Sequence, residues 1–240
     1  MKRKIITTGD GSKTIQIEDW NEQYHSVHGA INEANHVFIK HGLLHFFNQF
    51  GHAELDSASH HNSLFDNNNQ EISILEIGFG TGLNAFLTLI EAEKLKKTIS
   101  YVGVEAYPVK QEEIEVLNYV DLISTQHQTK FELLHTSPWD EVITVSKYFQ
   151  LKKEEKFFKD ISAISKFDIV YFDAFGARVQ PDLWTEDIFR LMYHAMKPSS
   201  VLVTYSAKGS VRRAMQSVGF EVERLEGPPN KRHMLRAIKR

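Results

Sequence analysis

A glycine-rich loop between an apolar run and a helical pattern constrains this sequence more than any other feature. The loop, Gly78-Phe79-Gly80-Thr81-Gly82, follows the run ISILEI at 72–77 and precedes LNAFLTLIEAEKL at 83–95, whose apolar residues recur at helical spacing. A strand, a glycine turn and a helix in this order are the context of a nucleotide-binding loop in a parallel sheet. We therefore expect an α/β fold with a ligand at this turn.

The segments after the loop alternate between strand and helix patterns, as in a parallel α/β sheet. We expect strands at 99–106, 131–135, 167–175 and 200–206, and helices at 109–120, 183–196 and 211–218. Two last strands, 220–227 and 231–239, are joined by a turn at Pro228-Pro229-Asn230, which predicts an antiparallel hairpin. A Rossmann-like, mostly parallel sheet ending in such a hairpin is the plan of the class I S-adenosylmethionine-dependent methyltransferases.

The composition fits one globular domain in a reducing compartment. The chain has 240 residues, of which 42% are hydrophobic, and it contains no Cys. No stretch of about 18 apolar residues and no secretory leader is visible, so we expect a cytoplasmic protein without a membrane span. We divide the chain into an N-terminal lead-in segment and loop that pack on the core, residues 1–70, and the methyltransferase core, residues 71–240.

The lead-in part contains one helical pattern, ANHVFIKHGLLHFFNQF at 34–50, and then a polar stretch at 51–70 that we interpret as a loop. His52, His60 and His61 lie in that loop without the spacing of metal ligands. We expect no metal.

The spacing of the glycines distinguishes between classes of nucleotide ligand. In dinucleotide dehydrogenases the third glycine comes one position later, where this chain has Leu83, so the pyrophosphate of NAD or FAD is poorly matched. S-Adenosylmethionine has no pyrophosphate, and glycines let the backbone approach its methionine part while helix N-terminal amides face its carboxylate. We predict cofactor contacts from Gly78, Gly80, Thr81 and Gly82.

Four further polar residues are candidate cofactor ligands. Glu76 is placed to receive the ammonium group, directly or through water, and Asn84 either contacts the cofactor or caps the helix. Glu105 ends the second strand, where doubly wound folds place a carboxylate for the ribose hydroxyls; the alternative is an acid at a helix start ahead of Pro108. Asp160 is the candidate partner of the adenine amino group, or else a surface acid or helix cap.

Asp173 is the candidate catalytic residue. It comes at the end of the run FDIVYF, at the crevice where open α/β sheets bind ligands. Methyl transfer from a sulfonium is an in-line displacement, and an amine acceptor must attack unprotonated, so a carboxylate there can orient the amine or take its proton. The alternative is that Asp173 caps the turn after the strand.

Five ordered motifs resemble one family, the tRNA 5-(aminomethyl)uridine methyltransferases, known as one half of the bifunctional enzyme MnmC and as the stand-alone MnmD. The motifs are Tyr24-His25-Ser26-Val27-His28-Gly29-Ala30 with Glu33 and Val37-Phe38, LEIGFGTGLN at 75–84, DAFGARVQPDLWT at 173–185, TYSAKGSVRRAMQSVGF at 204–220 and KRHML at 231–235. The loop GARVQ at 176–180 differs from the Ser-Pro-Ala-Lys-Asn type of the bifunctional form.

The resemblance implies methylation of the aminomethyl group on carbon 5 of the wobble (2-thio)uridine of tRNA, which gives the methylamino form. It implies that Gly78, Gly80, Gly82 and Glu105 bind S-adenosylmethionine and that Asp173 faces the acceptor amine. The FAD-dependent half of the bifunctional enzyme has no counterpart here, so we expect no FAD and a precursor supplied by another route.

An anticodon loop can be held by cations on its phosphates and by aromatic stacking on a splayed base. Residues 206–240 carry nine Lys or Arg against three Glu, an excess of six positive charges. The candidate tRNA contacts are Lys208, Arg212, Arg213, Lys231 and Arg232 for phosphates, and Tyr24, Phe175 and Trp184 for stacking, with Tyr205 and Ser206 as weaker candidates. The alternatives are a solvated basic face and aromatics that belong to the core.

Several other functions compete with this hypothesis. A small-molecule amine methyltransferase or an aminopropyltransferase would use the same cofactor pocket without needing the basic C-terminal part. A binding module that has kept the fold without activity is a second class, and an NAD oxidoreductase is a third. The intact glycine loop and Asp173 argue against the module, and Leu83 argues against NAD.

Overall fold

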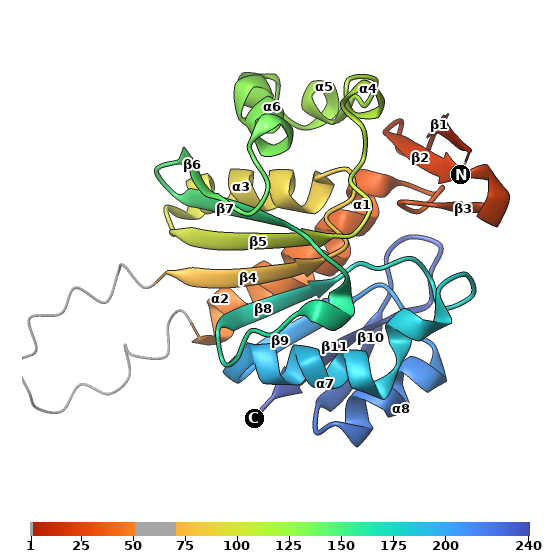
Figure 1. Ribbon diagram of the computed structural model, residues 1–240, viewed down its shortest axis with the longest axis vertical. Helices are drawn as coiled ribbons and strands as arrows, with labels where there is room; N and C mark the ends of the chain where they lie inside the picture. The colour runs from red at the N-terminus through yellow and green to blue at the C-terminus, as the bar shows by residue number, and fades with distance from the viewer. Residues whose placement is uncertain (1, 51–70) are drawn as a thin grey trace, which may run out of the picture.

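A computed structural model describes residues 2–50 and 71–240. An eight-stranded sheet runs through the molecule in the order β10-β11-β9-β8-β4-β5-β7-β6 and is covered by helices on both faces (Figure 1). Its strands are β4 (Ile72–Ile77), β5 (Ile99–Glu105), β6 (Val142–Ser146), β7 (Phe149–Glu155), β8 (Phe167–Phe172), β9 (Met196–Thr204), β10 (Glu221–Glu226) and β11 (His233–Lys239). The fold class predicted from the sequence is confirmed.

The centre of the sheet is parallel and its two edges are antiparallel. Strands β7, β5, β4, β8 and β9 pair in parallel, while β11 pairs antiparallel with both β9 and β10. The predicted C-terminal hairpin is therefore confirmed. Because β4 and β8 are parallel neighbours, the residues that follow them, the glycine loop and Asp173, come out at one edge of the sheet.

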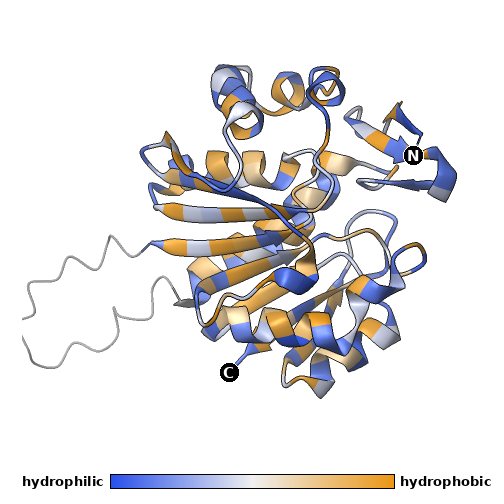
Figure 2. Cartoon of the chain, viewed as in Figure 1, coloured by the Kyte–Doolittle hydropathy of each residue, from blue (hydrophilic) through white to orange (hydrophobic). Residues whose placement is uncertain are grey.

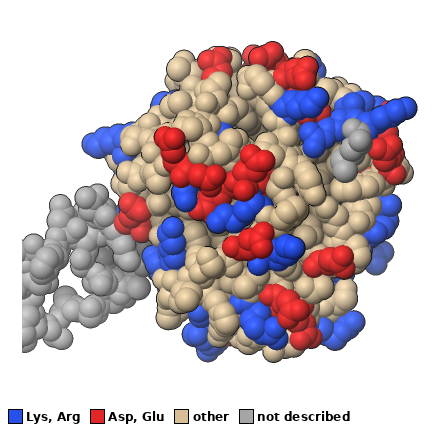
Figure 3. Space-filling model, viewed as in Figure 1, with Lys and Arg blue, Asp and Glu red and all other residues tan. Residues whose placement is uncertain are grey.

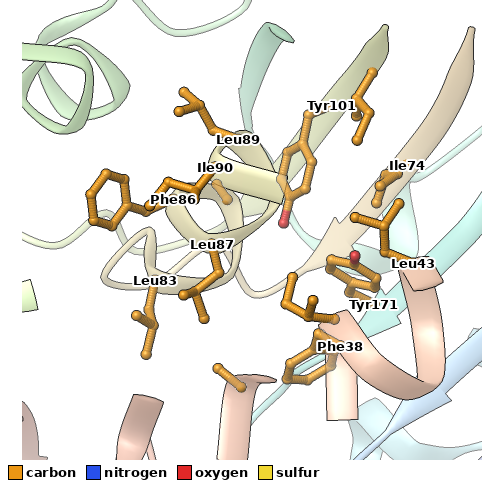
Figure 4. Packing of buried hydrophobic residues seen from close by; sticks show 14 of the residues in the cluster. Phe38, Leu43, Ile74, Leu83, Phe86, Leu87, Leu89, Ile90, Tyr101 and Tyr171 are labelled. Atoms are coloured by element: carbon orange, nitrogen blue, oxygen red, sulfur yellow. The ribbon is translucent and has the colours of Figure 1, made fainter. Parts of the chain in front are cut away.

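Alternating side chains of the central strands fill two cores, one on each face of the sheet. On one face Ile74, Tyr101 and Tyr171 pack against α1 (Ala30–Ala34), the π-helical η2 (Asn35–Leu44), α3 (Leu83–Leu95) and α6 (Gln128–Thr136), as Figure 4 shows in part. On the other face Leu75 and Val102 pack against α7 (Glu186–Ala195) and α8 (Gly209–Ser217). Figure 2 shows the resulting pattern of apolar strands under amphipathic helices.

The first 50 residues contain more regular structure than their sequence indicates. A three-stranded antiparallel sheet, β1 (Arg3–Thr7), β2 (Lys13–Ile17) and β3 (Glu22–Gln23), lies beside the carboxyl ends of the main strands (Figure 1). A short 3-10 helix, η1 (Glu18–Trp20), connects β2 to β3. The helix predicted at 34–50 begins at α1 and continues through η2 into α2 (His45–Phe50). The loop predicted at 51–70 lies outside the described residues.

Two predicted elements were wrong, and both lie between β5 and β8. The expected strand at 131–135 is part of α6, and its buried residues Phe131 and Leu134 are three apart, which is a helical spacing. The expected helix at 109–120 is interrupted and forms α4 (Gln111–Ile114) and the start of α5 (Tyr119–Ile123). Three 3-10 helices complete the elements, η4 (Thr125–His127), η5 (Phe158–Asp160) and η6 (Pro181–Trp184).

The third parallel strand, β7, was missed because its sequence is FQLKKEE. Lys153 occupies a buried position there and is only 1% exposed. Its Nζ donates a hydrogen bond to His135 O at 2.7 Å and lies 4.9 Å from the centre of the Trp139 ring, and burial lowers its pKa to about 8. A charged residue thus occupies a core position, which hides the alternation of the strand.

No helix among residues 2–50 and 71–240 is long and apolar enough to cross a membrane. In the same residues, no group of three or more His, Cys, Asp or Glu side chains is arranged to hold a metal ion.

Candidate active site

A cavity of about 850 Å³ lies at the carboxyl ends of β4, β5 and β8. The N-terminal sheet forms its opposite wall, through residues such as Arg3, Trp20 and Tyr24. Arg178, in the loop after β8, ties the two walls together, because its Nη2 donates to Trp20 O, Asn21 O and Glu22 Oε2 at 2.9 to 3.0 Å. The volume is in the range of small-molecule sites.

The glycine loop forms the floor of one end of the cavity. Gly78 has φ +91° and Gly80 has φ +49°, and both line the cavity. A Cβ on Gly78 would meet Asp173 O at 2.7 Å, and one on Gly80 would meet Tyr24 Cδ1 at 3.0 Å. Both the backbone conformation and the space therefore require glycine at these positions.

Glu105 stands beside this floor. Its Oε2 accepts the Gly80 N–H at 3.1 Å and its Oε1 accepts the Tyr107 N–H at 3.0 Å. Burial raises the pKa of the carboxyl, and these backbone donors oppose the rise. Each carboxylate oxygen keeps a further lone pair for a hydroxyl of a ligand. Tyr107 and Phe157, in edge contact at 6.1 Å, add apolar lining next to it.

Five predicted cofactor residues do not line the cavity, namely Glu76, Thr81, Gly82, Asn84 and Asp160. Thr81 is buried and its hydroxyl is 3.2 Å from the Tyr119 hydroxyl. Glu76 is 1% exposed. Asn84 does not cap the helix, since Gly82 is the N-cap residue and the Asn84 amide nitrogen instead donates to Glu76 Oε1 and Asp173 Oδ2, both at 2.9 Å.

Asp173 comes directly after β8, with its backbone against Gly78 of the glycine floor, and we call the lining around its side chain the acceptor end of the cavity. Burial raises its pKa to about 7; the Asn84 hydrogen bond and the Lys231 charge lower it, and the Glu33 charge raises it. Glu33, on α1, is 8% exposed and forms an ion pair with Lys231 in the turn between β10 and β11. The Lys231 ammonium also lies 4.5 Å from the centre of the Tyr205 ring. Asp173, Glu33, Lys231 and Tyr205 all line the cavity.

Aromatic rings cover this acceptor end. Phe175 makes edge contacts with Tyr24 at 4.9 Å and with Trp20 at 5.7 Å, and all three line the cavity. Trp184 does not line it, because the indole is 5% exposed and its Nε1 donates to Phe175 O at 2.8 Å. Tyr205 donates from its hydroxyl to Ala174 O at 2.8 Å. Trp184 and Tyr205 thus support the loop that carries Phe175.

The remaining predicted residues lie around or away from the cavity. Asp160 is exposed in η5 and is not a lining residue, whereas its neighbours Phe158 and Lys159 are. Ser206 is buried next to the fifth parallel strand. Lys208, Arg212, Arg213 and Arg232 are exposed. On the face that Figure 3 presents, acidic and basic side chains alternate, without a uniformly basic area.

Sequence reasoning missed the residues that the N-terminal segment contributes. Arg3, Trp20, Glu22 and His25 line the cavity although they precede the glycine loop by more than 50 residues. His25 and Glu33 were noted only as parts of a family motif. No spacing signal connects these residues to Asp173, because their proximity depends on how the N-terminal sheet packs.

The cavity suits S-adenosylmethionine in its shape and in its polar groups. The glycine floor leaves space that a Cβ would fill, Glu105 offers carboxylate oxygens to ribose hydroxyls, and Tyr107 and Phe157 offer apolar contact to a base. Residues 149–240 match the model of a family described as S-adenosyl-L-methionine-dependent methyltransferase. The match covers the last 92 residues of the chain, and the fold and the cavity agree with this class of enzyme.

Two individual relatives carry a more specific name than the family model does. The chain is 27% identical to the "tRNA 5-methylaminomethyl-2-thiouridine biosynthesis bifunctional protein MnmC" of Leptospira interrogans over 96% of this chain and 34% of that protein. It is 24% identical to the protein of the same name from Hydrogenovibrio crunogenus, over 97% and 33%. The chain therefore spans about a third of the length of these relatives. These matches confirm the resemblance to the family that was identified from the motifs.

Solved structures agree on the fold. MnmC2 from Aquifex aeolicus superimposes with a TM-score of 0.75 over 98% of this chain and 69% of that one, at 24% identity. Spermidine synthase from Thermotoga maritima gives a TM-score of 0.50 at 12% identity, over 98% of this chain and 72% of that one.

Proposed function

We propose that this protein methylates the 5-aminomethyl group of the wobble (2-thio)uridine in tRNA, with S-adenosylmethionine as methyl donor, and that it does so in the cytoplasm. The observation that carries the proposal is Asp173, a half-buried carboxyl group on the wall of the cavity that the glycine floor also lines. The similarity to proteins named for tRNA 5-methylaminomethyl-2-thiouridine biosynthesis, along 96% of this chain, supports the choice of acceptor.

The charges of the cavity favour an amine acceptor. Its lining includes five carboxyl groups against three cationic side chains. The acids are Glu22, Glu33, Glu105, Asp173 and Asp182, and the cations are Arg3, Lys159 and Lys231. Arg3 is paired with Glu113, Lys231 with Glu33, and Glu22 with Arg178. Among the described residues, the lining groups outside these ion pairs are the acids Glu105, Asp173 and Asp182 and the cation Lys159. A primary ammonium group entering the acceptor end therefore meets a net negative field.

The reaction requires the acceptor nitrogen to be neutral when it attacks. When bound, S-adenosylmethionine supplies the electrophilic methyl group. Asp173 takes the proton from the acceptor ammonium, and its pKa of about 7 lets it accept that proton and release it to water near neutral pH. Glu105 and the glycine floor hold the donor, and the rings of Phe175 and Tyr24 hold the uracil, so that the two reacting atoms are kept in line.

The tRNA is expected to present its anticodon loop at the open side of the cavity. A base that is unstacked from the loop can reach a buried carboxyl group, whereas a base in a duplex cannot. The exposed cations Lys208, Arg212 and Arg213 at the start of α8 and Arg232 after β10 are proposed to hold phosphates.

The test is transfer of labelled methyl groups to bulk tRNA from cells that lack this protein, followed by nucleoside mass spectrometry, with Asp173→Ala in parallel. We expect 5-aminomethyl(2-thio)uridine to be converted to its methylamino form, and the variant to lose about 10²–10⁴-fold in turnover while it still binds S-adenosylmethionine. Methylation or aminopropylation of a free small amine, with tRNA unlabelled, would overturn the assignment of the acceptor and leave that of the cofactor.

A further inference from the structure

Asn84 joins two carboxyl groups that come from neighbouring strands. It lies in the first turn of α3, and its Nδ2 donates to Glu76 Oε1 on β4 and to Asp173 Oδ2 after β8, each at 2.9 Å. The two acceptors are on parallel neighbours, since Glu76 pairs with Tyr171 in the sheet. Both hydrogens of one amide nitrogen are therefore used, one on each carboxyl group.

The two hydrogen bonds that Nδ2 donates determine the orientation of the Asn84 amide. Asn84 Oδ1 is buried and has no hydrogen-bond partner. A rotated amide would point its oxygen at two carboxyl oxygens and leave its two donors unpaired, which is unfavourable in a buried site. The hydrogen bonds to Asp173 and to Glu76 therefore fix the orientation of the Asn84 amide together.

We propose that Asn84 is a positioning residue for Asp173 and that Glu76 fixes the direction of the Asn84 amide. This inference rests on the proposed function, and it assigns these two residues to the acceptor end of the site and not to the cofactor. The hydrogen bond to Oδ2 holds the Asp173 carboxylate in one rotamer, so that Oδ1 faces the proton of the acceptor ammonium.

The placement of the two residues argues against direct contact with the cofactor. Neither Glu76 nor Asn84 lines the cavity, although Gly78 and Gly80, which lie between them in the sequence, do. A residue that acts only through Asp173 has to change the protonation of Asp173 without changing cofactor affinity. This difference separates the two roles experimentally.

The charges that face Asp173 determine how its titration responds. Burial raises its pKa and the Asn84 hydrogen bond lowers it, so loss of Asn84 is expected to raise it further. The carboxyl of Glu76 has its own pKa raised well above the usual value, chiefly by burial. The other titratable groups that act on Asp173 are Glu33 on α1, Lys231 in the last turn, Tyr101 on β5 and Tyr205 after β9.

The first experiment compares pH profiles of kcat/KM for methyl transfer to tRNA. Asn84→Leu is expected to move the acid limb up by about one pH unit, the value of one hydrogen bond to a charged group, and to lower the rate at pH 7 by about fivefold. Asn84→Ser, which keeps one hydrogen-bond donor, should move the acid limb of the profile by less. Thr88→Val is the matched control, because it removes the buried Thr88 hydrogen bond to Asn84 O and touches neither carboxyl group.

The second pair of variants tests the role of Glu76. Glu76→Leu removes the acceptor that fixes the amide and should shift the profile in the same direction as Asn84→Leu. Glu76→Gln keeps an acceptor oxygen and should restore most of the shift. Calorimetry with S-adenosylmethionine and thermal unfolding are measured on every variant, so that a folding defect is recognised.

Two outcomes overturn the inference. One is a tenfold or larger loss of S-adenosylmethionine affinity in Asn84→Leu with an unshifted profile, which would make Asn84 a cofactor residue. The other is an unchanged pH profile in all four variants of Asn84 and Glu76. If the wild-type protein does not methylate tRNA at all, the proposed function fails separately. Carbon-13 carboxyl NMR of Asp173, assigned with Asp173→Asn, then still reports whether Asn84→Leu raises its pKa.

Discussion

The two ends of the cavity are built in opposite ways. The proposed cofactor end comes mainly from one stretch, residues 78–107, and consists largely of backbone: a glycine floor and the N–H groups that hold Glu105. The proposed acceptor end comes from three distant segments and consists of side chains, with Glu33, Asp173 and Lys231 brought together from α1, the loop after β8 and the turn between β10 and β11. A local backbone site tolerates few changes, whereas a composite side-chain site can be adjusted one residue at a time.

The largest effect is expected when a side chain is placed on the glycine floor, which tests whether the cofactor binds to this backbone. Gly78→Val places a β-branched side chain at φ +91° with its Cβ 2.7 Å from Asp173 O. We expect loss of about 1–3 kcal/mol or more of stability and no measurable binding of S-adenosylmethionine by calorimetry. Near-normal affinity in a folded variant would show that the cofactor does not approach this backbone.

A smaller effect is expected at the side chain of the cofactor end. Glu105→Gln removes the charge but keeps the shape, and the hydrogen bonds that a carboxylate makes to hydroxyls are worth about 1.5–3 kcal/mol in all. The affinity for S-adenosylmethionine should fall by about tenfold or more, while the acceptor KM stays within about twofold of the wild-type value. An acceptor defect at unchanged cofactor affinity would contradict the division of the cavity into two ends.

At the acceptor end, Glu33→Gln should separate binding from chemistry. The variant removes the partner of Lys231 and one negative charge from the wall that faces the acceptor ammonium. We expect the KM for tRNA to rise by about two- to fivefold, in line with a partly exposed ion pair, with S-adenosylmethionine affinity unchanged. A lower kcat with the same KM would instead place Glu33 in the proton transfer.

The smallest expected effect is on stability and comes from Asp173. Its pKa is about 7 in the folded protein against a usual 3.8, so the folded state binds more protons between these values. The free energy of unfolding of the wild-type protein should therefore fall as the pH rises from about 4 to about 7. Asp173→Asn should lack this fall and melt higher at pH 8, by on the order of 2–4 °C for each kcal/mol that ionisation of Asp173 costs the folded state. Equal melting temperatures at pH 8 would argue that Asp173 is not desolvated.

The same contrast explains which parts of the fold and the site could be predicted from the sequence alone. The glycine loop, Glu105 and Asp173 follow directly after parallel strands, and such positions can be predicted because strand ends converge at one edge of a sheet. Strand β7 was not predicted because Lys153 occupies a core position in it. The strand expected at 131–135 was wrong because the spacing of its apolar residues is helical. Whether the predicted cofactor and tRNA residues act as assigned stays a prediction.

The acceptor end could not be assembled from spacing. Glu33 and Lys231 are separated by nearly the whole chain, and their pairing depends on the packing of α1 and the last hairpin. Lys231 was predicted to hold phosphate; in the structure it pairs with Glu33, which the sequence did not indicate, and its contact with tRNA stays a prediction. Trp184 was predicted to stack on a base, and in the structure it is buried with its N–H bonded to the backbone. Both differences depend on tertiary contacts that a sequence pattern does not contain.

The pairing of α1 with the last turn also determines when the site comes into existence during synthesis. The glycine loop, β4 and β5 have been synthesised once the ribosome has passed the middle of the chain, and β8, the other neighbour of β4, follows later. Glu33 has no partner until residue 231 has left the exit tunnel. A nascent chain stalled before that point is expected to have the cofactor floor and to lack the finished acceptor wall. The proposed methylation of tRNA should therefore begin only after β11 has inserted between β9 and β10.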